Sequence, residues 1–177
     1  FPSNGGLSPQ EPSISVDGLG NAIIGGNFYS NMTFQTQPPT QLNVSWDVTG
    51  CFSKHDAFVA KIDAFGEWKW ARDVGSNSSC VEIINDLETN YEGSILLAGG
   101  FMGRSGQNIL EIGNHSFTTA MSGSYDYDIF IAGMDSSGNW SMAEVTEGSS
   151  NNYASNVGFL NNTHGYSGAE IYDSITY

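Results

Sequence analysis

Nineteen acidic side chains in this 177-residue sequence could take part in chemistry. Two carboxyl groups roughly 5 to 10 Å apart across a cleft would suit glycoside hydrolysis, in which one protonates the leaving group while the other attacks or activates water. The acids without a counterpart elsewhere in the chain are Glu82, Asp86, Glu88, Glu111 and Asp126. None stands in a recognisable catalytic motif, so a polysaccharide-cleaving enzyme is the second alternative and not the leading hypothesis.

Asp126 and Asp128 are also candidates for binding a hard cation. In Tyr125-Asp126-Tyr127-Asp128 the two carboxylates alternate along one face of an extended segment, and calcium prefers several oxygen ligands. The segment lacks the complete loop of alternating Asp or Asn with a closing Glu. The three histidines show no metal-ligand spacing, and no nucleophile elbow, phosphate-binding loop or dinucleotide fingerprint occurs. We therefore expect no catalytic residue and no cofactor, with calcium as a weak candidate.

Cys51 and Cys80 are the only cysteines. They stand just before and just after a predicted pair of antiparallel strands, where the two chain ends would lie side by side. A disulfide there closes a loop of roughly 30 residues and contributes about 3 kcal/mol by the chain-entropy estimate. Two cysteines without neighbouring histidines make a poor zinc site. The prediction is a disulfide, and hence an oxidising compartment.

Acceptor triplets for N-glycosylation are more frequent than composition alone predicts. All lie in inserts, turns or the last part of the chain, where a bulky glycan projects into water. An Asn-, Ser- and Thr-rich loop composition also produces such triplets, so occupancy stays open. The acceptors are Asn31, Asn43, Asn77, Asn114, Asn139 and Asn161.

The elements that position these residues follow an internal repeat. Asp56–Trp68 recurs 72 positions later as Asp128–Trp140, and Gly20–Phe28 recurs as Gly93–Phe101. A fixed period means that one supersecondary unit is used again and buries its faces against its neighbours. We divide the chain into an N-terminal extension (1–7), a first repeat (8–80), a second repeat (81–152) and a partial third repeat or exchanged strand segment (153–177).

Each repeat shows four apolar segments bounded by Gly, Asn, Asp and Ser, the pattern of strands joined by turns. Asp63–Gly66 and Asp135–Gly138 predict turns, because Asp can bond the backbone two residues on and Gly suits the fourth position. Tryptophans 68, 70 and 140 repeat with the fold, which favours packing over ligand binding. The expected strands are Ile14–Asp17, Asn21–Phe28, Ala57–Ile62 and Glu67–Val74, then Val81–Asp86, Ser94–Phe101, Ile129–Met134 and Asn139–Val145.

The segments Asp17–Phe28 with Asp56–Trp70, and Gly93–Phe101 with Asp128–Trp140, resemble the repeats of secreted bacterial and archaeal β-propeller proteins. The resemblance implies four-stranded blades, an extracellular location and no known chemistry. Two and a third units cannot close a ring, since propellers typically have four to eight blades. The expected fold is therefore all-β, with antiparallel four-stranded meander repeats that are propeller-blade-like and incomplete, or alternatively packed as a β-sandwich.

The charge balance limits the kinds of partner that the protein is expected to bind. The formal net charge is −14 with five cations, which repels nucleic-acid backbones and anionic lipid headgroups. There is no apolar run near 18 residues, no visible signal peptide, and no initiator Met, which fits a processed or truncated chain. The leading hypothesis is a secreted, N-glycosylated, non-catalytic subunit that self-associates into a homo-oligomer, filament or surface layer through exchanged strands. The first alternative is a carbohydrate- or calcium-binding propeller module, with Trp46 as its unrepeated aromatic residue.

Overall fold

The computed structural model describes residues 12–44, 55–75, 81–102, 107–120, 127–146, 152–162 and 164–171. Within these ranges all regular structure is β-strand, no residue is helical, and every strand pair is antiparallel apart from one isolated bridge between His55 and Val81. The described sheets form no closed barrel. The predicted all-β, antiparallel fold class is confirmed.

The first four-stranded sheet is a meander with an insertion. Its strands are β1 (Ser13–Val16), β2 (Ala22–Phe28), β5 (Asp56–Ile62) and β6 (Trp68–Val74), hydrogen-bonded in the order β1-β2-β5-β6. Between its second and third strands the chain forms a separate hairpin of β3 (Met32–Phe34) and β4 (Thr40–Leu42).

The second four-stranded sheet has the same plan. It consists of β7 (Val81–Thr89), β8 (Ile95–Met102), β11 (Asp128–Met134) and β12 (Trp140–Thr146), with the hairpin of β9 (Gln107–Ile112) and β10 (His115–Ala120) inserted at the equivalent place. A last hairpin, β13 (Asn152–Phe159) and β14 (Gly165–Ile171), has only two described strands.

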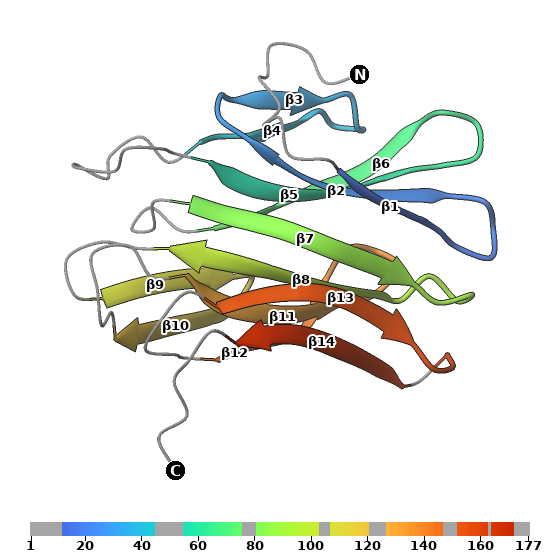
Figure 1. Ribbon diagram of the computed structural model, residues 1–177. Coiled ribbons are helices and arrows are strands. Elements are labelled where there is room, and N and C mark those ends of the chain that lie inside the picture. Colours follow the sequence, from blue (N-terminus) through green and yellow to red (C-terminus); the bar gives the residue numbers. More distant parts are fainter. Residues whose placement is uncertain are drawn as a thin grey trace.

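These sheets and hairpins lie in layers (Figure 1). Apolar side chains of β3–β4, including Met32 and Phe34, pack on one face of the first sheet. The opposite face packs on the second sheet in the largest apolar cluster, which Leu110 and Ile112 of β9 also join. Ala154 and Val157 of β13 cover the far side of the second sheet. The order of layers is therefore β3–β4, first sheet, second sheet, β13–β14.

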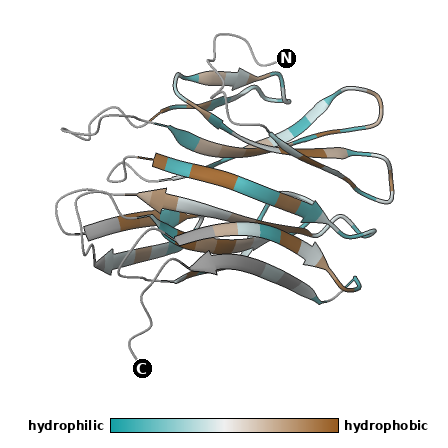
Figure 2. Cartoon of the chain, in the orientation of Figure 1, coloured by the Kyte–Doolittle hydropathy of each residue, from teal (hydrophilic) through white to brown (hydrophobic). Residues whose placement is uncertain are grey.

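Strand β5 shows why an apolar segment becomes an inner layer. Its successive side chains point to opposite faces. Phe58 and Ala60 join the cluster under β3–β4, while Ala57 and Val59 join the cluster between the two sheets. Strand β7 instead alternates between hydrophobic and hydrophilic segments, as Figure 2 shows.

The hairpin turns have the predicted construction. In Asp63–Gly66, the side-chain oxygen Oδ1 of Asp63 accepts the backbone N–H of Phe65, and the N–H of Gly66 returns to the Asp63 carbonyl. Asp135–Gly138 repeats both bonds. Gly66 and Gly138 have φ angles of 87° and 79°, a left-handed region that glycine adopts without a Cβ clash. Two further turns of this kind, Asp17–Gly20 and Asn90–Gly93, join β1 to β2 and β7 to β8.

Candidate functional site

Side chains of the first strand of one sheet form hydrogen bonds with the backbone of the first strand of the next sheet. Ser13 and Ser15 of β1 accept hydrogen bonds from the backbone N–H groups of Leu87 and Thr89 of β7, at 3.1 and 3.0 Å. Side chains of β1 thus satisfy backbone groups on the open edge of β7. These bonds set the position of the second sheet against the first.

The same kind of junction recurs one layer on. Asp86 of β7 accepts the backbone N–H of Val157 of β13 at 3.0 Å, and Asn85 donates to the carbonyl of Ala154 at 2.7 Å. The other carboxylate oxygen of Asp86 accepts the hydroxyl of Ser13. β13 therefore sits on β7 much as β7 sits on β1, and the stack of layers propagates in one direction.

The β13–β14 layer covers only half of the second sheet. Ala154, Val157 and Phe159 of β13 form an apolar cluster with Leu96 and Ala98 of β8 and with Ile129 and Ile131 of β11. Beyond β14 the outer surfaces of β11 and β12 border an open groove of about 500 Å³. Its floor includes Ile131, Met142 and Glu144, and its wall includes Phe159, Gly165 and Ser167. We call this the β11–β12 groove.

On the opposite outer face, that of the first sheet, the described residues also cover one half. The β3–β4 hairpin covers the β5–β6 half, where Phe34 contacts the rings of Phe58 and Trp68. On the β1 side, Ile14 and Val16 are each 60% exposed. The two outer faces are therefore covered on opposite halves: the β5–β6 half of the first sheet and the β7–β8 half of the second.

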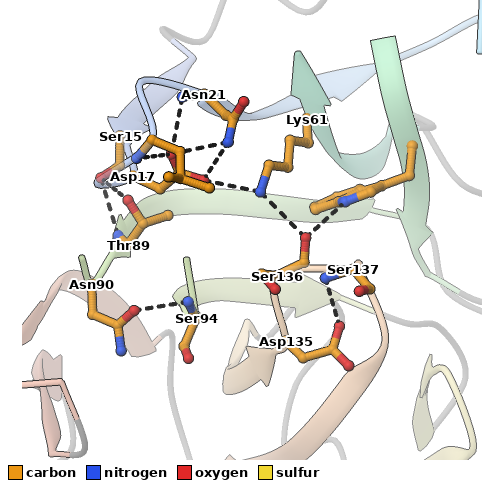
Figure 3. A network of polar contacts seen from close by, with 12 residues as sticks. Ser15, Asp17, Asn21, Lys61, Thr89, Asn90, Ser94, Asp135, Ser136 and Ser137 are labelled. Carbon is orange, nitrogen blue, oxygen red and sulfur yellow. Dashed lines mark hydrogen bonds and ion pairs between the residues drawn. The ribbon is translucent and has the colours of Figure 1, made fainter. Parts of the chain in front are cut away.

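A buried polar network ties the turn ends of the two sheets together (Figure 3). The ammonium group of Lys61 lies 3.0 Å from Asp17, and both side chains are almost fully buried. Lys61 also donates to the carbonyl of Ser136, as does the indole N–H of Trp70. Burial alone raises the pKa of Asp17, but hydrogen bonds from Asn21, Lys61 and the backbone outweigh it and lower the pKa to about 2. This network holds Asp17 as a carboxylate and fixes the spacing between the sheets.

The turn aspartates are held by hydrogen bonds within the turns that they begin. The backbone N–H of Glu67 is the main cause that lowers the pKa of Asp63, and the N–H of Asn139 does the same for Asp135. Both carboxylates are thus held by the turn that each one forms. Trp70 is buried, and its ring lies against Gly138 of the second sheet, so its repeated position reflects packing between sheets.

Five predicted glycan acceptors lie among the described residues, and all five are exposed. Asn31 accepts the backbone N–H of Val44 through its side-chain oxygen at 3.0 Å, which joins the two ends of the β3–β4 hairpin. This hydrogen bond does not involve the side-chain amide nitrogen of Asn31, which is the atom that would carry a glycan. The exposed acceptors are Asn31, Asn43, Asn114, Asn139 and Asn161.

The described acidic candidates differ in their surroundings. Asp128, the described calcium candidate, is buried and hydrogen-bonded to the hydroxyl of Thr119. Glu82 is fully buried, whereas Glu88 and Glu111 are exposed. Among the described residues no group of three or more His, Cys, Asp or Glu side chains is arranged to hold a metal ion. Cys51, Cys80, Asn77, Asp126 and Trp46 lie outside the described residues.

Comparison of the chain with protein-family models and with curated proteins gives no match. Within the described ranges there is no helix long and apolar enough to cross a membrane. The described fold defines the class: an all-β protein of stacked antiparallel sheets, with a half-covered face at each end of the stack. The candidate functional site consists of the β11–β12 groove, the exposed side of β1, and the edge of β14 that pairs with no other described strand.

Proposed function

We propose that this chain is a non-catalytic structural subunit that assembles with copies of itself, outside the cell, into a filament or surface layer. One observation carries the proposal. The first and second sheets have four strands each in equivalent orders, while the β13–β14 layer has two described strands and leaves the β11–β12 groove beside them. In this proposal the sheets are propeller-like blades in an open stack, and a neighbouring copy supplies what the third blade lacks.

Strand edges support this mode of assembly. A sheet edge exposes unpaired N–H and C=O groups and pairs readily with another chain unless it is blunted. Among the described strands β14 pairs only with β13. Strand addition at such an edge gains main-chain hydrogen bonds, while the groove beside it receives side chains.

The two ends of the stack also favour a polymer. One end presents Ile14 and Val16, and the other presents the groove with Met142 and Ile131 on its floor. Because these surfaces differ, contact between them is heterologous, and such a contact repeated without closure forms a filament. Exposed glycan acceptors and the expected Cys51–Cys80 disulfide suit an extracellular polymer.

Electron microscopy combined with size-exclusion chromatography and light scattering tests the proposal. The full glycosylated chain is expected to form elongated assemblies or a mass series without a fixed upper limit. A stable monomer at all accessible concentrations overturns the proposal. A closed ring of fixed copy number instead supports the propeller-module alternative, for which a glycan array and a calcium titration of the Asp126 and Asp128 variants are the next measurements.

A further inference from the structure

We infer that the β3–β4 hairpin of a neighbouring copy occupies the β11–β12 groove and lies beside β14, so that hairpins from two chains make one complete layer. This inference rests on the proposed self-assembly and names the segment that performs it. The partner is a second copy of this chain, and the contact surface is the side of β3–β4 that faces away from its own first sheet.

The first argument is the complementary coverage of the two outer faces. The β3–β4 hairpin lies over the β5–β6 half of the first sheet, and β13–β14 lies over the β7–β8 half of the second sheet. When one copy is placed on the next in the direction of the existing stack, these half-layers meet in a single layer and occupy different halves of it.

Charge supplies the second argument. Residues 18–46 and 148–169 are the two longest stretches of the sequence without Asp, Glu, Lys or Arg. They contain β3–β4 and all but the end of β13–β14, respectively. In a chain of net charge −14, apposed copies repel each other through their acidic surfaces. Placing the two uncharged hairpins side by side removes that repulsion from the contact, which is the pattern expected of a self-association surface.

Side-chain direction supplies the third argument. Leu42 and Phe34 are buried against the first sheet, so Gln41 and Thr33, at alternate positions, point away from it. Gln41 is exposed. In the proposed layer these two polar, uncharged side chains face the groove floor, which mixes apolar Met142 and Ile131 with polar Ser141 and Glu144.

Cysteine cross-linking tests the geometry. The double variant Gln41→Cys with Met142→Cys is expected to give a ladder of covalent multimers under mild oxidation or with a short bis-maleimide. The same link within one chain is excluded, because Gln41 and Met142 lie on outer layers separated by both sheets. Cys51 and Cys80 are present in every sample, so each single variant is the control for links made by these two cysteines. Each single variant is expected to give no ladder.

A charge series tests the energetics without a large change of shape. Gln41→Glu places a carboxylate against Glu144 and is expected to weaken assembly by about tenfold or more, because like charges brought together at an interface repel each other. Gln41→Lys is expected to assemble far better than Gln41→Glu. Thr118→Glu is the matched control, since Thr118 is exposed on the equivalent hairpin β9–β10, which has no docking role in this arrangement.

The outcomes separate the two proposals. Assemblies that form normally but give no ladder, and that tolerate Gln41→Glu as well as Thr118→Glu, overturn this inference and leave the structural function standing. Absence of any assembly by the wild-type chain overturns both. A ladder from the double variant, together with selective loss of assembly in Gln41→Glu, is the expected result.

Discussion

The ion pair of Asp17 and Lys61 makes the free energy of unfolding depend on pH in a way that one substitution isolates. The two side chains are 3% and 9% exposed. Asn90 occupies the corresponding turn position in the second sheet, where its side-chain oxygen accepts the N–H of Ser94. Asp17→Asn therefore keeps a residue that forms this turn, while it removes the charge opposite Lys61 and one carboxylate oxygen that accepts from Asn21.

The structure gives the size and sign of the effect. The pKa of Asp17 is lowered from 3.8 to about 2, a difference that corresponds to about 2 kcal/mol at neutral pH. Because the folded-state pKa is below the unfolded value, this stability is present above pH 3.8. It is lost as the pH falls through about 2. At pH 7, leaving Lys61 buried without its counter-charge brings the total cost of Asp17→Asn to about 3 kcal/mol.

Urea unfolding followed by tryptophan fluorescence, at pH 7, 4 and 2, measures this effect. The gap in unfolding free energy between wild type and Asp17→Asn is expected to be nearly full at pH 7 and 4 and to shrink strongly at pH 2. Asp135→Asn is the control, since that turn carboxylate is exposed and its substitution is expected to cost far less. A gap that is absent at pH 7, or that stays constant down to pH 2, would refute the reasoning.

Three further predictions concern packing and covalent structure. Gly138→Ala is expected to lower stability more than Gly66→Ala. Both glycines have positive φ, but a Cβ added at Gly138 meets the Trp70 ring at 2.7 Å, whereas a Cβ added at Gly66 meets nothing within 4 Å. Equal shifts in the thermal unfolding temperature would contradict this prediction. Reduction, or Cys51→Ser with Cys80→Ser, is expected to lower stability by about 3 kcal/mol, whereas free thiols in the native protein would rule the disulfide out. Enzymatic removal of N-glycans is expected to lower the intact mass, and Asn→Gln at each exposed acceptor assigns the sites; an unchanged mass would show that none is occupied.

Local signals in the sequence were sufficient to predict strands and turns such as β5 and Asp63–Gly66. β5 was predictable because apolar residues of Ala57–Ile62 occupy both faces, as in a strand buried on both sides. The turn at Asp63–Gly66 was predictable because its bonds run between residues two to four positions apart. Such interactions depend on neighbours in the chain, so residue type alone specifies them.

The candidate site was predictable only in outline. The repeat count indicated an incomplete last unit with open edges, but not the β11–β12 groove, because Met142 and Glu144 carry no signal that distinguishes them from covered residues. Their exposure depends on how far β13–β14 reaches across the second sheet. Asp128 is a second case: its sequence context made it a weak calcium candidate but did not indicate that the fold buries it beside Thr119.

The sequence by itself determined an acidic, all-β chain built from a repeated four-stranded unit with Asp- and Asn-initiated turns, since these features follow from residue type, alternation and period. Tertiary structure alone decided that Lys61 is buried between turns of two sheets, and that the two uncharged hairpins cover opposite halves of the outer faces. The physical reason is distance along the chain. Contacts such as Lys61 with Ser136 join residues 75 positions apart, and only the packing of whole sheets brings them together.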